Sequence, residues 1–145
     1  MEIALISHDS KKELMMQFCI AYCGILAKHH LCSTDVTGKY VEEATGLPIE
    51  RLLAGKQGGL EQIISRVAYD EIDLVLDFRK TGDNTGHMED EYMLSKMCDL
   101  HNIPLATNIA TAEALIIALD RGDFDYREAI NPNSEYNRRK RTSGQ

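Results

Sequence analysis

The sequence lacks any pair of cysteines separated by two intervening residues and any other cysteine spacing that is typical of a zinc site. Its cysteines lie at positions 19, 23, 32 and 98. Cys19 and Cys23 are one helical turn apart beside apolar residues, so we expect reduced, buried thiols. His29, His30 and Cys32 carry ligand atoms, but adjacent histidines before a strand do not easily converge on one ion. The sequence therefore predicts no metal site and no other cofactor.

Long apolar runs are also missing: none approaches the length needed to cross a membrane, and the first residues lack the pattern of a signal peptide. Basic residues are in the minority, with a net charge of −7, which argues against nucleic acid as a main partner. The 145 residues, of which 43% are hydrophobic and 27% charged, suffice for one domain with a proper core. We expect a cytoplasmic protein that binds neither membrane nor nucleic acid.

Short apolar segments alternate with longer segments of helical periodicity. The expected strands are residues 2–7, 31–34, 72–78 and 105–107, and the expected helices are residues 10–28, 38–45, 59–69, 89–101 and 111–121. Asp9 or Ser10 is the expected N-cap of the first helix, and Gly46 is expected to end the second. This alternation predicts an α/β fold: a single doubly wound domain with a mainly parallel central sheet flanked by helices.

The predicted domain occupies residues 1–130, and residues 131–145 form a polar tail with a basic run at 138–141. We expect this tail to be disordered, although a contribution to a neighbouring subunit is an alternative. Ligands of doubly wound sheets gather at the carboxyl ends of the strands. There the pattern brings together five loops: residues 8–9, 34–38, 54–59, 79–90 and 107–108.

The most informative stretch is GKQGGLE at residues 55–61, a glycine-rich turn that leads into a helix. Glycines allow close backbone approach to a ligand, and the first N–H groups of a helix attract anions. Together with IALISHD at residues 3–9 and PLATN at 104–108, this stretch resembles methylglyoxal synthase. The resemblance extends from about residue 2 to residue 127, with order and spacing retained.

The resemblance implies a homohexamer whose reaction abstracts a proton from dihydroxyacetone phosphate and expels phosphate to give methylglyoxal. Such a protein is a carbon–oxygen lyase that acts on phosphates. It needs a phosphate cradle, a general base and donors for the developing oxyanion.

Matching positions supply several of these parts. By resemblance, the substrate-binding residues are Lys12, Thr34, Thr37, Gly38 and Gly55, and the catalytic residues are His8, Asp9, His87 and Asp90, with Thr107, Asn108 and Thr111 forming a wall. Arg127 matches an arginine that a neighbouring subunit supplies in the family. Asp9 and Asp90 also suit helix starts, so a capping role is an alternative for both.

Other positions depart from the family. Leu60 stands where the family has the aspartate that serves as general base, and a leucine cannot accept a proton. Glu61 is a candidate substitute, although consecutive helix positions are rotated by about 100°. In the phosphate loop Asp35 introduces a carboxylate, which would weaken phosphate binding if it points inward but matters little if it points outward. Ala54 replaces a serine, and Lys80 replaces an aspartate and becomes a candidate substrate-binding residue.

Three functions remain open from the sequence. The first is slow methylglyoxal synthesis with a substitute base. The second is a related reaction on another small, phosphorylated or polyhydroxy metabolite. The third is a noncatalytic regulatory module that binds such a metabolite. The fold alone does not choose among them, because function depends on the site.

Overall fold

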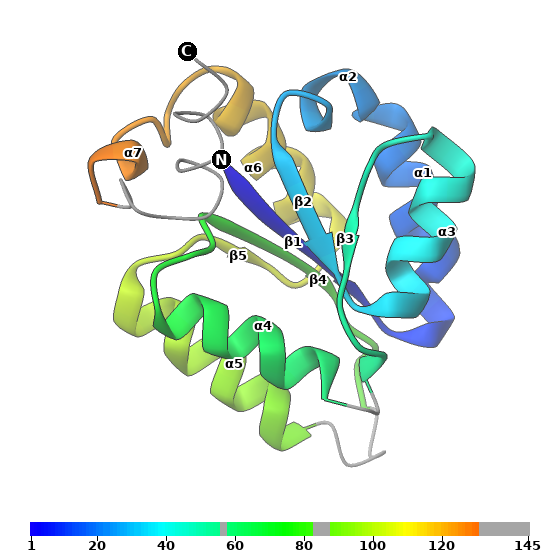
Figure 1. The fold of residues 1–145 in the computed structure, drawn as a ribbon, viewed down its shortest axis with the longest axis horizontal. Helices are drawn as coiled ribbons and strands as arrows, with labels where there is room; N and C mark the ends of the chain where they lie inside the picture. The colour runs from blue at the N-terminus through cyan, green and yellow to red at the C-terminus, as the bar shows by residue number, and fades with distance from the viewer. Residues whose placement is uncertain (56–57, 83–87, 131–145) are drawn as a thin grey trace.

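The computed structural model describes residues 1–55, 58–82 and 88–130. In this part of the chain a single sheet of five strands runs through the centre of the molecule (Figure 1). The strands are β1 (Glu2–Ser7), β2 (His30–Ser33), β3 (Glu50–Arg51), β4 (Leu74–Phe78) and β5 (Leu105–Ala106), in the spatial order β3-β2-β1-β4-β5. Every neighbouring pair is parallel. The predicted doubly wound, parallel α/β fold is therefore confirmed.

Helices cover both faces of the sheet (Figure 1). They are the 3₁₀ helix η1 (Asp9–Lys11), then α1 (Lys12–Ala21), α2 (Cys23–Leu26), α3 (Asp35–Thr45), α4 (Gly59–Ala68), α5 (Met88–His101), α6 (Ile109–Asp120) and α7 (Arg127–Ile130). Helices α1, α3 and α6 contribute to one hydrophobic cluster, and α4 and α5 to another. None of the helices in the described ranges is long and apolar enough to span a membrane.

The side chains of β1 alternate between these two clusters, because successive residues of a strand point to opposite faces. Ile3 and Leu5 pack in the cluster under α1, α3 and α6, whereas Ala4 and Ile6 pack under α4 and α5. In β4, Asp77 is the register partner of Ile6 and follows Val75 on the α4–α5 face. A carboxylate therefore replaces an apolar side chain at the carboxyl end of β4.

The first helical region differs from the prediction. His8, not Asp9 or Ser10, caps η1, and its Nδ1 accepts a hydrogen bond from the Ser10 N–H at 3.1 Å. The helix is also divided at Tyr22, where α1 ends and α2 begins. At the end of α3 the prediction was right: Gly46 has a left-handed φ of 73°, and its N–H donates to the Glu42 carbonyl.

Strand β3 and helix α7 were not predicted. Strand β3 contains only two residues, Glu50 and Arg51, neither of which is buried, so it shows no apolar alternation. The cysteines are free thiols: Cys19, Cys32 and Cys98 are buried, whereas Cys23 is half-buried. Within the described ranges, no group of three or more histidine, cysteine, aspartate or glutamate side chains is arranged so that it could hold a metal ion.

Candidate functional site

The loops after the strands meet at one edge of the sheet because all the strands are parallel. The loop after β2 carries a cluster of buried hydroxyl groups. Thr37 Oγ1 lies 3.0 Å from Ser7 Oγ and 3.4 Å from Thr34 Oγ1. Thr37 is 2% exposed, and its place in the first turn of α3 orients the hydroxyl toward β1. This cluster joins the ends of β1 and β2 and holds the start of α3 in place.

The N-terminus of α3 adds backbone donors to these hydroxyls. Within the described part of the chain, the N–H groups of Val36 and Thr37 have no hydrogen-bond partner, whereas the Asp35 N–H donates to the Leu53 carbonyl at 3.3 Å. Free N–H groups at a helix start attract anions. Lys12, the first residue of α1, lies beside α3, with its Nζ 4.8 Å from the ring centroid of Tyr40. Hydroxyls, amides and an ammonium group are therefore present at this corner of the molecule.

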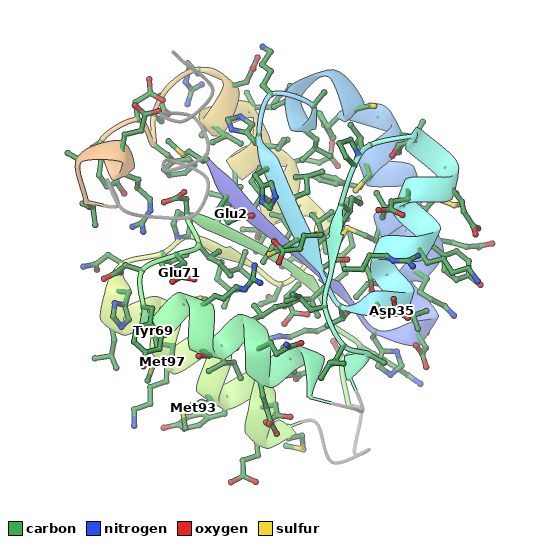
Figure 2. The ribbon with its side chains drawn as sticks, viewed as in Figure 1. Glu2, Asp35, Tyr69, Glu71, Met93 and Met97 are labelled. Carbon is green, nitrogen blue, oxygen red and sulfur yellow. The ribbon has the colours of Figure 1, made fainter. Side chains whose placement is uncertain are left out.

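The carboxylate of Asp35 points outward, which answers the question that the sequence left open. Its side chain is 47% exposed, and Oδ1 lies 3.5 Å from Arg51 Nε in β3. Figure 2 shows Asp35 at the start of α3, on the side of that strand. Arg51 offsets part of this charge, since its Nη1 also lies 3.9 Å from Glu42 Oε2, and the exposed carboxylate of Asp35 is directed away from the α3 donors.

Gly38 has a packing role in this loop. A Cβ there would lie 2.2 Å from Ser33 Oγ and 2.7 Å from Arg51 Cγ, so no larger residue fits without displacement. The Gly38 N–H already donates to the Thr34 carbonyl at 3.0 Å. The structure thus uses Gly38 to bring α3 close to β2 and β3, rather than to offer a free donor.

The glycine-rich turn before α4 also depends on close backbone approach. Gly59 donates its N–H to the Ala54 carbonyl at 3.0 Å, and a Cβ at Gly59 would lie 1.9 Å from the Leu53 carbonyl oxygen. Gly58 has a φ of 98°, which favours glycine. By contrast, a Cβ at Gly55 would contact no atom of the described residues within 4 Å.

Leu60 follows these glycines and faces the core. It is 7% exposed and belongs to the cluster that contains Ala4 and Ile6 of β1. Leu60, Ile63 and Val67 are spaced as one apolar stripe of α4, so the leucine continues the buried face of its helix. The position of the expected general base is therefore apolar and covered.

Glu61, the proposed substitute, points elsewhere. It is exposed, and its Oε2 lies 4.0 Å from where a Cβ of Gly58 would be. The carboxylate thus lies over the glycine turn at the start of α4, where the helix dipole favours negative charge.

The remaining predicted catalytic residues that the structure describes lie at two helix starts, those of η1 and α5. His8 lies between β1 and η1, and its backbone N–H donates to the Phe78 carbonyl of β4 at 2.9 Å. Asp9 is exposed in the first turn of η1, and Asp90 is half-buried in the first turn of α5. His87 lies outside the described residues.

A cavity of about 460 Å³ opens over the ends of β4 and β5. Its lining includes Lys11, Arg79, Lys80, Glu91, Thr107 and Asn108. Lys80 therefore lies at the edge where the sequence placed it, and Thr107 and Asn108 form part of a wall. Lys11 and Arg79 were not singled out in the sequence, because nothing in their local pattern separates them from ordinary surface cations.

Arg79 is held by a buried carboxylate that sequence analysis also missed. Its Nε donates to Asp77 Oδ2 at 2.7 Å, and its Nη2 donates to the Glu91 carbonyl and to Ser95 Oγ at 3.3 and 3.2 Å. Burial raises the pKa of Asp77 to about 6, although the Arg79 guanidinium opposes this shift. An acidic residue inside an apolar strand, two positions before an arginine, was the available signal.

Arg127 does not join the predicted site. It is fully buried in its own chain, with Nε donating to Asp73 Oδ1 at 3.0 Å and Nη2 to the Ile72 carbonyl at 3.4 Å. These partners directly precede β4. They therefore lie where the amino ends of the strands meet (the amino edge), opposite the loops described above. The expected substrate-binding role is therefore not supported, because the guanidinium is neither near the loops of its own chain nor exposed to a neighbouring subunit.

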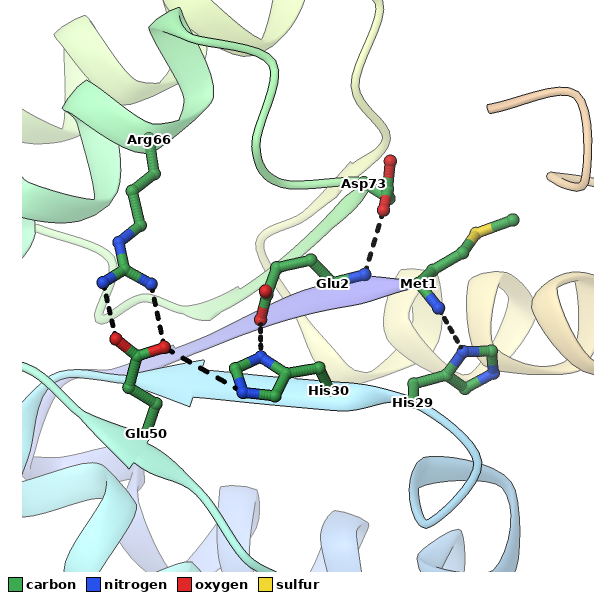
Figure 3. Close-up of polar contacts among 7 residues, drawn as sticks. All are labelled: Met1, Glu2, His29, His30, Glu50, Arg66 and Asp73. Atoms are coloured by element: carbon green, nitrogen blue, oxygen red, sulfur yellow. Dashed lines mark hydrogen bonds and ion pairs between the residues drawn. The ribbon is translucent and has the colours of Figure 1, made fainter. Parts of the chain in front are cut away.

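The amino edge carries a second polar network, shown in Figure 3. His30 Nδ1 contacts a carboxylate oxygen of Glu2, and Arg66 donates to both oxygens of Glu50 at 3.1 and 2.6 Å. The Glu2 N–H donates to Asp73 Oδ2 at 2.9 Å. Burial raises the pKa of Glu2, while His30 acts in the opposite direction. The charged groups at this edge join β1 to β2 and β3 to helix α4, at the opposite ends of the strands from the loops described above.

Comparison with known proteins agrees with this architecture. Residues 15–107 match the protein family described as the MGS-like domain. The methylglyoxal synthase of Caldicellulosiruptor saccharolyticus is 54% identical over 95% of this chain and 98% of its own, and that of Thermoanaerobacterium thermosaccharolyticum is 47% identical over 90% and 97%. A crystal structure of methylglyoxal synthase from Elizabethkingia anophelis NUHP1 has a TM-score of 0.74 at 34% identity, covering 79% of this chain and 76% of that one. The chain therefore belongs to the methylglyoxal synthase family.

Proposed function

We propose that this protein binds a small phosphorylated metabolite at the carboxyl edge of its sheet, and that its elimination of phosphate from dihydroxyacetone phosphate is impaired or redirected to another substrate. One observation carries the second part. Leu60 occupies the position where the family resemblance expects a general base, and it is packed in an apolar cluster. A side chain without an acidic or basic group in that position cannot abstract a proton.

The phosphate-binding part rests on the corner formed by β1, β2 and α3. Thr34 and Thr37 offer hydroxyls, the start of α3 offers backbone N–H groups, and Lys12 places a positive charge over Tyr40 of the same helix. Charge-assisted hydrogen bonds of this kind are the strong ones. The outward direction of Asp35 favours this role, because its carboxylate is 47% exposed and lies 3.5 Å from Arg51 Nε rather than among the hydroxyl groups.

The impairment follows from the cost of losing a base. Removing a general base lowers a rate by roughly 10²- to 10⁴-fold. Asp9, Glu61 and Asp90 are carboxylates at the same edge, but each lies in the first turn of a helix, where a carboxylate is also favoured by the helix dipole. We expect any remaining turnover to depend on one of them.

The test supplies purified protein with dihydroxyacetone phosphate and follows both phosphate and methylglyoxal. We expect the wild type to be at least about 100-fold slower than a family member with the aspartate, as the loss of a base requires. Leu60→Asp should raise the rate, whereas Leu60→Asn, of nearly the same size and polarity but without basicity, should not. A wild-type rate equal to that of the aspartate-containing enzyme would overturn the proposal.

Other outcomes separate the remaining functions. Slow wild-type turnover that disappears in Glu61→Gln identifies the substitute base, with Glu43→Gln on the exposed face of α3 as control. The alternative function is a noncatalytic regulatory module, and the apolar residue at position 60 is the observation that favours it. This alternative would be supported if the wild type and Leu60→Asp are both inert but bind phosphate esters. Binding would appear as a rise in melting temperature with ligand concentration.

A homohexamer in the cytoplasm remains a prediction from resemblance and composition. The exposed side of α5 supports assembly, because Tyr92 and Leu100 are 67% and 63% exposed there. Large apolar side chains on a surface often mark contacts between subunits. Light scattering that gave a monomer at micromolar concentration would contradict the hexamer.

A further inference from the structure

The cavity over β4 and β5 has a positive balance of charge among its described lining residues. Lys11 and Lys80 supply ammonium groups, and within the described part of the chain neither ammonium forms a hydrogen bond or an ion pair. Arg79 contributes little net charge, because it is paired with Asp77 at 2.7 Å. Glu91 supplies one opposing carboxylate. These groups together leave about one positive charge in excess.

Neutral donors complete the lining. Asn108 Oδ1 already accepts the Thr111 N–H at 3.0 Å, which fixes the side chain as the N-cap of α6 and leaves its amide N–H groups as donors. Thr107 adds a hydroxyl group to the same wall. Two ammonium groups, an amide and a hydroxyl around a cavity are suited to an oxygen anion. The single excess charge matches a carboxylate better than a phosphate dianion.

The cavity is separate from the phosphate-binding corner but close to it. Lys11 lines the cavity, while Lys12, the next residue, lies beside Tyr40 of α3. His8 lies between the two regions and is joined to β4 through its backbone hydrogen bond to Phe78. Strands β2 and β4 flank β1, so their ends are two strand spacings apart, about 10 Å. Side chains that reach inward from both ends would shorten this span to the length of a small metabolite.

We propose that the metabolite carries anionic groups at both ends: a phosphate held at the α3 corner and a carboxylate held by Lys11 and Lys80. The substrate class is therefore a short phosphorylated carboxylic acid. This inference rests on the proposed phosphate binding and extends it to the rest of the molecule. It also gives a reason for the lysine at position 80, since an aspartate there would repel the carboxylate.

Two commercially available compounds test the proposal directly. Glycerol 3-phosphate and 3-phosphoglycerate differ only by a hydroxymethyl group in place of a carboxylate. We expect calorimetry at low ionic strength to show 3-phosphoglycerate binding at least tenfold more tightly. Lys80→Gln and Lys11→Gln should reduce this ratio to about one. Lys96→Gln, an exposed lysine of α5 outside the cavity lining, should leave the ratio unchanged.

The outcomes distinguish this inference from the proposed function. If glycerol 3-phosphate binds but the wild-type ratio is near one, or if the ratio survives in both lysine variants, the carboxylate site is wrong and phosphate binding stands. If neither compound nor inorganic phosphate binds, the proposed function fails and this inference fails with it.

Discussion

Asp77 shows how one side chain connects burial, charge and position in the fold. It is the next-to-last residue of β4, a strand whose other residues are apolar; it is 3% exposed, and its only described ion-pair partner is Arg79. Taking a carboxylate out of water favours its neutral form, whereas a nearby guanidinium favours the charged form. Burial is the larger of the two effects here, so the pKa of Asp77 is raised to about 6.

This shift predicts a pH dependence of stability. Because the pKa is higher in the folded state than in the unfolded chain, the folded state binds more protons between about pH 4 and pH 6. The contribution of Asp77 to the free energy of unfolding should therefore fall as pH rises through this window, by about 3 kcal/mol. Asp77→Asn should remove that fall, as measured by urea unfolding at several pH values.

His29 makes the variant comparison necessary. Burial, and secondarily the N-terminal ammonium group, lowers its pKa to about 4. Its contribution to stability is therefore lost as pH decreases from about 6.5 toward 4, which opposes the effect of Asp77. The difference between wild type and Asp77→Asn isolates the carboxylate. A difference that does not change with pH would show that the pKa of Asp77 is not raised.

At the scale of single elements, the glycine turn before α4 positions that helix. Gly59 packs against the backbone of Leu53, and its N–H bonds to Ala54. This contact sets where α4 begins and therefore which residues of the helix face the sheet. The apolar stripe that starts at Leu60 depends on it.

Two glycine substitutions separate this contact from a general effect of turn flexibility. Gly59→Ala places a Cβ 1.9 Å from the Leu53 carbonyl oxygen, so we expect a loss of about 1–3 kcal/mol of stability, as for other overpacked sites. Gly55→Ala meets no atom within 4 Å among the residues that the structure describes and should change stability by less than about 0.5 kcal/mol. Denaturant unfolding of both variants measures the difference. Equal losses would contradict the steric explanation.

At the scale of the whole molecule, the two edges of the sheet have different uses. The carboxyl edge carries the loops with donors, while the amino edge contains ion pairs closed within the chain. The Arg127–Asp73 pair at 3.0 Å joins α7 to the start of β4 and is fully buried. Removing one partner of such a pair leaves a buried charge and typically costs 3–5 kcal/mol.

We therefore predict that Arg127→Met lowers the free energy of unfolding by roughly 3–5 kcal/mol. Asp73→Asn combined with Arg127→Met should recover part of this loss, because the isolated carboxylate is removed. Affinity for glycerol 3-phosphate, measured by calorimetry at a temperature where both variants are folded, should stay within twofold of wild type. A large loss of affinity in the folded Arg127→Met variant would contradict this prediction and would show that Arg127 contributes to ligand binding.

Much of this organisation could be predicted from the sequence. The apolar run at β1 and the periodicity of α4 and α6 are strong local signals, and parallel strands then fix the edge where the loops meet. The direction of Asp35 and the true partner of Arg127 could not be predicted, because both depend on residues distant in sequence, Arg51 and Asp73. Strand β3 was missed because two residues contain too little pattern.

The short link between His8 and Phe78 has a consequence for ligand choice. This hydrogen bond joins the ends of β1 and β4, so the distance between the two strand ends does not change when a ligand binds. A ligand site that spans these strand ends therefore selects ligands by their length. Acids one or two carbons too long or too short should be rejected by their length rather than by their charge.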